Sequence, residues 1–313
     1  MLKAPLDFDR LRADLELLQR AEFAISTERG YSHDGAKFAA WCSEAGLVAL
    51  PATPDTLALF LADMLAQGRK VNTIARYVSG IAWMHRRENL PSPVDETVRQ
   101  TVCGARRIRW EPLRQMRPLT VAQLRRVVAL GSGTPMAARD KAIVLIGFSS
   151  GLRRSNLAAL QIEDVEFREQ GLLIRIRREK QDRRGISRQL AIPYGRHALT
   201  CAVTTLSAWL DVRGRAPGPL FTRLDHGRTT DFDPLTPHAI YAVVKKAVAL
   251  IGLDPCNFGP HSLRAGLIVA ACLAGVPHAL IAVTSGHKSM DNLQGYCRPV
   301  DLFEASAAGR IGL

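Results

Sequence analysis

A short basic segment most strongly constrains how this chain can fold. The segment CGARRIRWEPLRQMRP, residues 103–118, holds five arginines and two prolines and lacks helical spacing of apolar residues. Such a composition is typical of a linker between domains, although the charged face of a helix is an alternative. Since 313 residues suffice for two domains, we expect domains at residues 1–105 and 119–313, joined by residues 106–118.

The part before this segment predicts helices only. Its apolar residues recur at near-helical spacing, and polar, glycine and proline residues fall where helices would begin or end. The expected helices lie within residues 7–23, 26–46, 53–70 and 71–93. Four helices with short connections predict a small bundle without strands.

The part after the segment predicts helices and one β hairpin. Hydrophobic residues alternate with basic ones on both sides of the turn QDRRG, which favours strands at 171–180 and 187–193. The alternating hydrophobic residues are Leu173, Ile174, Ile176, Leu190 and Ile192. Helices are expected within 119–130, 138–152, 197–214, 236–252, 262–275 and 277–286. The predicted fold class is therefore mainly α with a small β component.

The charge of the chain favours a polyanionic partner. There are 42 lysines and arginines against 29 aspartates and glutamates, and the net charge is +13. This excess indicates nucleic acid rather than a membrane. Because neither a signal peptide nor an apolar run of about 18 residues is visible, we expect a cytoplasmic protein that associates with the nucleoid.

The cysteines predict neither a zinc site nor a disulfide framework. They are scattered along the chain without a C-x-x-C pair. We therefore expect all six to be reduced and structural: Cys42, Cys103, Cys201, Cys256, Cys272 and Cys297.

Two short motifs place an arginine among apolar residues. In GLRRSNLAAL, residues 151–160, Arg153 precedes an apolar run, and in PHSLRAG, residues 260–266, His261 and Arg264 are three positions apart. Residues at that spacing share one face of a helix. The pair could bind one phosphate, with the arginine as a planar donor and the histidine as donor or base. For either motif alone, a surface pair is the commoner explanation.

A third motif lies near the C-terminal end. The stretch SGHKSMDNLQGYCRP, residues 285–299, contains His287 and Tyr296. Taken singly, Tyr296 could be a buried aromatic residue and His287 a helix C-cap. Lys180, beside the hairpin turn, could be an ordinary solvated charge.

The order of these motifs favours a shared site. GLRRSNL, the hairpin with Lys180, HSLR, SGH and GYCRP follow one another as in the tyrosine recombinases, the phage-integrase family, which the chain resembles from about residue 120 to the end. KFAAWC and AWMHRRENLPSP also resemble helices of the Cre branch. The resemblance implies an N-terminal helical core-binding (SAM-like) bundle and a C-terminal α+β catalytic domain, which together clamp DNA.

The resemblance also implies catalytic residues and a reaction. The candidates are Arg153, Lys180, His261, Arg264, His287 and Tyr296. Tyr296 would attack DNA to form a 3′-phosphotyrosyl intermediate, and a second DNA end would reverse the step through a Holliday junction. The arginines and His287 would stabilise the transition state, His261 would act as hydrogen-bond donor or general base toward the tyrosine proton, and Lys180 would protonate the leaving oxygen. No metal, ATP or other cofactor is expected.

One position departs from the family pattern. Three residues after its first arginine the family usually carries Glu or Asp, whereas this chain has Asn156. A carboxylate there would anchor an arginine by a charge-assisted hydrogen bond, which an amide can only do more weakly. We expect Asn156 to support the site, with an effect on the rate.

Two helices and the tail are expected to make further contacts. The DNA-binding candidates are Asn72, Thr73 and Arg76 in the first domain and Thr236, His238, Lys245 and Lys246 in the second. An exposed helix face is the alternative for each. The tail, residues 301–313, is expected to dock on a neighbouring protomer, giving a dimer per DNA site and a tetramer on two sites; a frayed terminus is the alternative.

Three other functions compete with recombination. A type IB topoisomerase would use similar chemistry on one strand. A catalytically weak protein would bind its DNA site without forming an adduct, and Asn156 favours this alternative. A metal hydrolase is disfavoured, because H-x-x-R lacks the spacing of metal ligands and no carboxylate cluster accompanies it.

Overall fold

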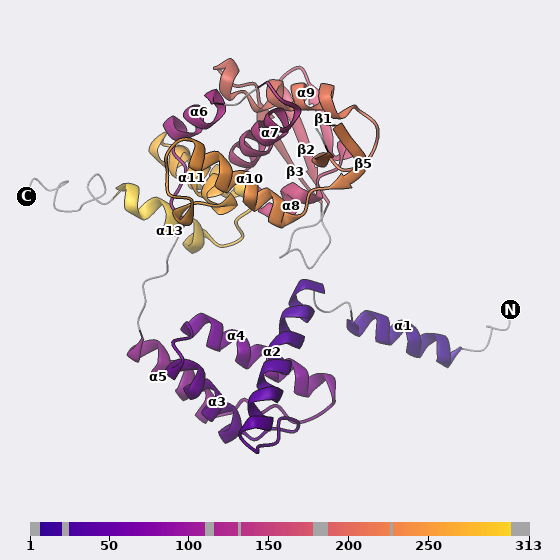
Figure 1. Ribbon diagram of the computed structural model, residues 1–313, viewed down its shortest axis with the longest axis vertical. Helices are drawn as coiled ribbons and strands as arrows, with labels where there is room; N and C mark the ends of the chain where they lie inside the picture. The colour runs from indigo at the N-terminus through magenta and orange to yellow at the C-terminus, as the bar shows by residue number, and fades with distance from the viewer. Residues whose placement is uncertain are drawn as a thin grey trace, which may run out of the picture. The chain divides into compact units, whose positions relative to one another are not determined.

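The chain forms two compact units, residues 1–113 and 114–313, in the computed structural model (Figure 1). The structure describes residues 7–20, 25–109, 116–130, 133–177, 187–225 and 228–301. Among these residues, no helix is both long and apolar enough to cross a membrane.

The N-terminal unit is helical throughout its described part. Its helices are α1 (Phe8–Arg20), α2 (Ile25–Glu44), α3 (Pro54–Ala66), α4 (Val71–Arg87) and α5 (Glu96–Ile108). Helix α2 packs on α4, and α3 packs on α5. Phe60 lies at the centre, with ring centroids 5.1 Å from Phe38 and 5.4 Å from Tyr77. The four predicted helices are confirmed.

Helix α5 corrects the sequence interpretation of the basic segment. Asp95 accepts a hydrogen bond from the Val98 backbone N–H at 3.0 Å and begins a helix that continues to Ile108. Residues 103–108 therefore belong to α5 and not to a linker. For these residues the alternative interpretation, the charged face of a helix, is correct. The helix is hard to predict from the sequence because only Val98 and Ala105 are buried along it. Two buried positions do not produce a clear helical pattern of apolar residues.

The C-terminal unit is built around helix α7 (Pro135–Ser150), which is buried along most of its length. Its other helices are α6 (Val121–Ala129), α8 (Arg154–Ala159), α9 (Ala202–Arg213), α10 (Pro237–Leu250), α11 (Pro260–Leu273), α12 (His278–Ser285) and α13 (Met290–Asp301). Helices α9, α10 and α11 pack on α7. A Cβ at Gly147 would lie 2.8 Å from Leu263 Cδ1, so the glycine lets α11 approach α7 closely.

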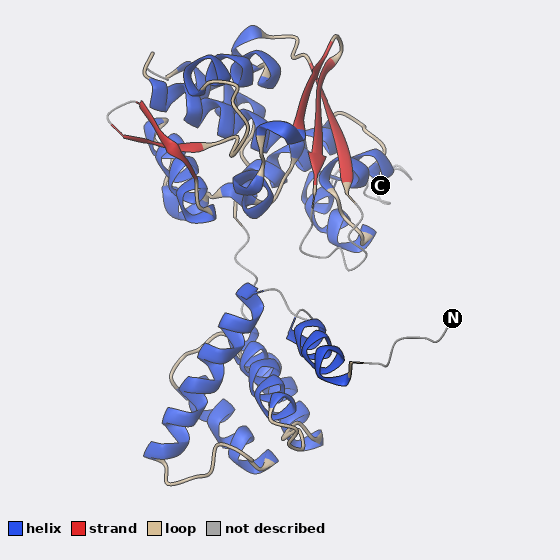
Figure 2. Ribbon diagram, turned by 90° about the vertical axis from the view of Figure 1, so that its right-hand side faces the viewer, coloured by secondary structure: helices blue, strands red, loops and turns tan. Residues whose placement is uncertain are grey.

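A three-stranded antiparallel sheet lies at one side of the C-terminal unit (Figure 2). It runs in the order β1 (Val165–Arg168), β2 (Gly171–Ile176) and β3 (Arg188–Pro193), with Ile174 opposite Leu190. The predicted hairpin is confirmed, but Leu172, rather than Leu173, joins Ile174 and Ile176 on the buried face. Strand β1 and the small hairpin of β4 (Thr222–Asp225) and β5 (Arg228–Pro234) were not predicted.

One pair of cysteines contradicts the expectation of reduced thiols. Cys272 on α11 and Cys297 on α13 form a disulfide whose Cα atoms are 6.0 Å apart. The prediction was wrong for this pair because helix packing brings together two cysteines 25 positions apart, and no local spacing reveals that. The other four cysteines are free.

Candidate active site

The first turn of α11 carries His261 and Arg264. Gly259 precedes the helix in an extended conformation, Pro260 begins it, and the Gly259 N–H donates to Ser262 Oγ at 3.1 Å. Proline suits a first helical position, where its missing N–H costs no intrahelical bond. His261 is exposed at the surface, whereas Arg264 is only 2% exposed. The expected i, i+3 pair thus lies at the start of one helix, with His261 at the surface and Arg264 in the interior.

Arg264 connects the ends of two helices. Its Nη1 donates to the carbonyl oxygen of Gly151 at 2.7 Å and also to that of Ser285. Gly151 ends α7 in the left-handed region, with φ of 60°, and Ser285 is the last residue of α12. The last carbonyls of a helix lack intrahelical donors. Arg264 satisfies two of them while directing Nη2 to within 3.0 Å of His287 Nε2.

His287 is held by the hydroxyl of Ser285. Gly286, with φ of 70°, turns the chain at the end of α12, and His287 Nδ1 lies 2.7 Å from Ser285 Oγ. Ser285 donates its single hydrogen to the Ile281 carbonyl at 2.6 Å, so its oxygen accepts from Nδ1–H. Burial, and then the charges of Arg264 and Arg153, lower the pKa of His287 to about 4. The imidazole is therefore neutral near pH 7.

Tyr296 lies on α13, with its hydroxyl 2.5 Å from Nε2 of His261. Burial raises the pKa of Tyr296, although Arg264 and Arg153 act in the opposite direction. His261 is exposed as a whole residue, but the part of its ring beside Tyr296 is desolvated. This desolvation, and then the charges of these two arginines, lower the pKa of His261. Near pH 7, a neutral phenol therefore donates to a neutral imidazole that is able to accept its proton.

A small apolar cluster fixes α13 in this position. Leu293 and Cys297 face Ile268 of α11 and Ile281 of α12, and all four side chains are buried. Tyr296 packs at the edge of this cluster, next to Cys297 in the chain, so its ring remains between His261 and His287. Its ring centroid is 5.9 Å from each imidazole centroid.

Arg153 differs from Arg264 in having no hydrogen-bond or ion-pair partner among the described residues. It precedes α8 as the N-cap residue and is half-buried. Among the described residues, its side chain makes no hydrogen bond or ion pair. Its charge nevertheless influences the pKa values of His261, His287 and Tyr296. The guanidinium therefore lies within electrostatic range of all three side chains, and no partner among the described residues neutralises its charge.

The structure thus brings together Arg153, His261, Arg264, His287 and Tyr296, while Lys180 lies outside the described residues. Asn156 is buried and its Oδ1 lies 3.4 Å from Ser155 Oγ, but its Nδ2 has no hydrogen-bond partner. It forms no bond to an arginine among the described residues. The supporting contact expected from this position is therefore not seen. Sequence reasoning missed Ser285, whose role depends on a turn that only the structure reveals.

The DNA-binding candidates of the N-terminal unit lie in the first two turns of α4. Asn72 is exposed and Thr73 is half-buried. Arg76 Nη1 lies 2.7 Å from Oδ2 of Asp34, a carboxylate on α2 with no exposed surface. Arg76 is thus an ion-pair partner that joins α2 to α4, although 45% of its side chain remains exposed.

The candidates on α10 differ in their surroundings. Thr236 caps the helix by accepting from the Ala239 N–H at 3.1 Å. Lys245 donates to the Pro255 carbonyl and lies 5.0 Å from the ring centroid of Tyr241, so its charge is partly occupied. His238 and Lys246 are exposed.

The sequence carries a clear family match. Residues 117–301 match the Phage integrase family. The chain belongs to the phage integrase family. Among its relatives is the "Integrase/recombinase xerD homolog" of Selenomonas ruminantium, 32% identical over 92% of this chain and 86% of the relative. The "Tyrosine recombinase XerA" of Pyrococcus horikoshii is 25% identical over 79% of this chain and 76% of the relative.

The fold is also that of solved phage integrase family structures. The XerH site-specific recombinase bound to difH substrate, in a pre-cleavage complex, superimposes with a TM-score of 0.60 and 17% identity. The match covers 89% of this chain and 78% of that one. These tyrosine recombinase relatives are of the Xer type, and the resemblance to the Cre branch remains an expectation.

Proposed function

We propose that this chain is a site-specific DNA recombinase in which Tyr296 cuts DNA and remains attached to the 3′-phosphate. The observation that carries the proposal is the 2.5 Å separation between Tyr296 Oη and His261 Nε2. A neutral phenol is a weak nucleophile, and a base within hydrogen-bond distance activates it as attack proceeds. Tyr296 forms the new P–O bond, its proton passes to His261, and the DNA 5′-oxygen leaves.

Arg153 and Arg264 stabilise the charge that develops on the non-bridging phosphate oxygens. Each donor contributes on the order of 3 kcal/mol, by comparison with oxyanion holes. Arg264 is held in place by two carbonyls, whereas Arg153 is free to close on the phosphate. His287 is neutral in the unbound protein, and a bound phosphate raises its pKa because the added negative charge favours the imidazolium. Proton uptake at Nε2 then supplies a further donor.

The remaining assignments follow the family resemblance. Lys180, which lies between β2 and β3 in the sequence, protonates the leaving 5′-oxygen. The residues up to the end of α5 at Ile108 bind DNA as the core-binding domain, the following residues to 118 act as the linker, and residues 119–313 form the catalytic domain of a clamp. The tail, residues 301–313, joins protomers into a dimer on each site and a tetramer on two sites. The protein works on nucleoid DNA in the cytoplasm.

The test begins by finding the DNA site. Duplexes from a random library are selected with the Tyr296→Phe protein, which keeps the phosphate-binding residues but lacks the nucleophile. A selected sequence is then rebuilt with a nick near the expected cleavage point, so that the short 5′-hydroxyl fragment diffuses away. We expect wild type to form an SDS-stable protein–DNA adduct at the 3′-phosphate, and Tyr296→Phe to form none.

Tyr194→Phe is the matched control, because Tyr194 is exposed in the loop after β3. It should form the adduct at the wild-type rate. An adduct with Tyr296→Phe, or none with wild type on a site that it binds, would refute the mechanism. Relaxation of supercoiled DNA lacking the selected site would favour a type IB topoisomerase instead, and site binding without an adduct would indicate a catalytically weak protein.

A further inference from the structure

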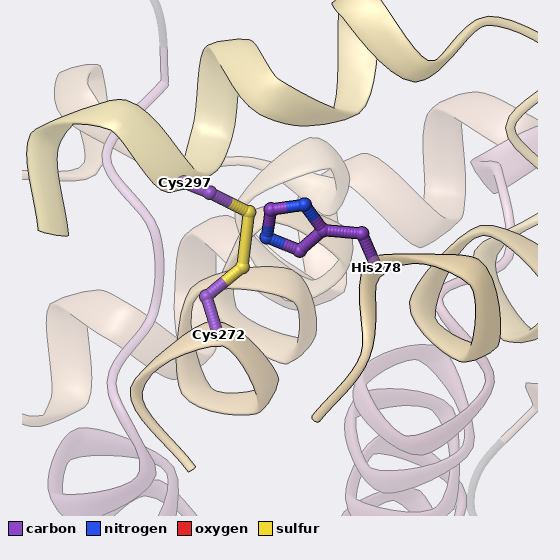
Figure 3. Close-up of side chains that lie close together, drawn as sticks. All are labelled: Cys272, His278 and Cys297. Atoms are coloured by element: carbon purple, nitrogen blue, oxygen red, sulfur yellow. A yellow bond between two sulfur atoms is a disulfide. The ribbon is translucent and has the colours of Figure 1, made fainter. Parts of the chain in front are cut away.

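Three potential metal ligands meet beside the helix that carries Tyr296. Cys272 comes from the last turns of α11, His278 begins α12, and Cys297 lies on α13 (Figure 3). Their ligand atoms all lie within 4.8 Å of one another. Cys297 is buried, and the other two are half-buried. In Figure 3 the imidazole of His278 faces the two sulfur atoms, so all three side chains converge on one point.

We propose that the reduced form of this trio, Cys272, His278 and Cys297, is a zinc site that fixes α13 to α11 and α12. Thiolate and imidazole are the ligands that zinc prefers in proteins, and two cysteines with one histidine leave one tetrahedral position for water. No fourth cysteine, histidine or carboxylate joins this group among the described residues. The site is separate from the five residues assigned to phosphate chemistry.

The geometry permits the change from disulfide to zinc site. Two thiolates on one tetrahedral zinc are roughly 3.8 Å apart, given a Zn–S distance of about 2.3 Å. The sulfurs must separate from their bonded position by less than about 2 Å, which small side-chain rotations can supply from Cα atoms 6.0 Å apart. His278 needs no large movement, because its ring already faces both sulfurs.

The chemistry balances with an added dithiol reductant. The reductant supplies two electrons and two protons, breaks the S–S bond and leaves two thiols, while becoming a disulfide itself. Zinc binding then releases the two thiol protons, because the metal binds thiolate. Oxidation reverses the sequence, so disulfide and zinc exclude each other at this site.

The position of the site suggests what it stabilises. Cys297 is adjacent to Tyr296. Among the residues that the structure describes, the apolar cluster under α13 has four buried side chains, two of which belong to α13. A metal bridging three helices would add a strong constraint to this small contact. The effect on DNA cleavage rests on the proposed function, whereas zinc binding does not.

The experiment uses the full chain after reduction and removal of the reductant without air. Zinc is titrated in competition with a chromophoric chelator, and Co²⁺ then replaces zinc as an optical probe. We expect one ion per chain, with the charge-transfer absorption of thiolate–Co²⁺ bonds. Cys272→Ser, Cys297→Ser and His278→Asn should each weaken zinc binding more than about 100-fold, since even loss of an outer-shell partner costs about 10- to 100-fold.

The exposed free thiols supply the control. Cys103→Ser and Cys256→Ser remove thiols outside the trio and should leave affinity and stoichiometry unchanged. Circular dichroism verifies that each variant is folded. If a cysteine variant does not fold, the zinc affinity of folded His278→Asn tests the proposal instead. Absence of zinc binding by reduced wild type, or full affinity in folded His278→Asn, would overturn the proposal. Adduct formation is measured separately, so failure of the recombinase mechanism would leave the zinc result interpretable.

Discussion

Arg264 donates a hydrogen bond from Nη1 to the carbonyl oxygen of Gly151, 2.7 Å away. Replacing Arg264 by alanine leaves this buried carbonyl and that of Ser285 without the donor. Each such group costs about 1–3 kcal/mol, so we expect Arg264→Ala to lower the free energy of unfolding by about 2–6 kcal/mol and to abolish the adduct. Urea denaturation and the nicked duplex measure the two effects.

Arg153→Ala is the matched comparison. Because Arg153 is half-buried and without a described partner, its loss should abolish the adduct while changing the free energy of unfolding by less than about 0.5 kcal/mol. If both substitutions lower the free energy of unfolding equally, the assignment of a structural role to Arg264 but not to Arg153 is wrong.

Ser285→Ala should disturb His287 with little effect on the fold. The variant removes the oxygen that accepts from Nδ1–H of His287, a bond worth about 1 kcal/mol to stability. We expect slower single-turnover cleavage with nearly unchanged DNA affinity, because His287 loses its orientation. The ¹⁵N NMR signals of His287 should report a mixture of tautomers in place of the Nδ1–H form.

The control for that variant is Thr284→Ala, which removes a neighbouring hydroxyl bound to the Leu280 carbonyl of the same helix. It should preserve both the cleavage rate and the tautomer. An unchanged His287 spectrum in Ser285→Ala would contradict the assigned hydrogen bond.

Cleavage should persist under mildly acidic conditions. A general base must be neutral, and the pKa of His261 lies below 6.5 because its ring is desolvated and close to Arg264 and Arg153. At subsaturating DNA, the rate reports on the unbound protein, so we expect its acid limb to fall below pH 6.5. Single-turnover rates across the acidic range test this, and a midpoint above 6.5 would exclude His261 as the base.

Stability should fall with pH between 6.5 and about 4. In this range unfolded His287 binds a proton and folded His287 does not, so acid favours the unfolded state, by up to about 1.4 kcal/mol per pH unit for each such group. The contribution of His287 is complete above 6.5 and is lost as pH falls through its folded pKa. Urea midpoints should show a shallower pH dependence for His287→Gln, and an identical slope would disprove the lowered pKa.

Arg76→Gln should affect the fold more than DNA binding. Asp34 is fully buried, and burial raises its carboxyl pKa even though Arg76 lies beside it. Without Arg76 this carboxylate loses its partner, at a cost of about 1–3 kcal/mol. The slope of log affinity against log salt concentration should change by less than about 0.9, which is the change expected for the loss of one phosphate contact. Exposed Arg69 provides the control, since Arg69→Gln should leave stability unchanged.

Most of the helices could be predicted from the sequence because they carry their own start and stop signals, whereas α5, α8 and α13 were not predicted. Thr120 begins α6 with a capping box, and Gly151 ends α7 in the left-handed region, both as local residue preferences require. Strand β1 carried no such signal, because none of its four residues is fully buried. Its pairing with β2 depends on the neighbouring strand.

The candidate site also contains features that the sequence predicts and features that it does not. His261 and Arg264 could be placed on one helix start from their spacing alone. The partners of Arg264 could not be predicted, because two of them are backbone carbonyls at the ends of α7 and α12. The Cys272–Cys297 bond likewise depends on how α13 lies against α11.

The attachment of α13 has a consequence for the position of Tyr296. Of the α13 side chains that the structure describes, only Leu293 and Cys297 are buried, whereas Arg264 is anchored inside the unit. Tyr296 is therefore carried by an element with few buried contacts, which the Cys272–Cys297 disulfide ties to α11, the helix of Arg264. Breaking that one covalent bond would leave the position of the tyrosine dependent on a small apolar contact.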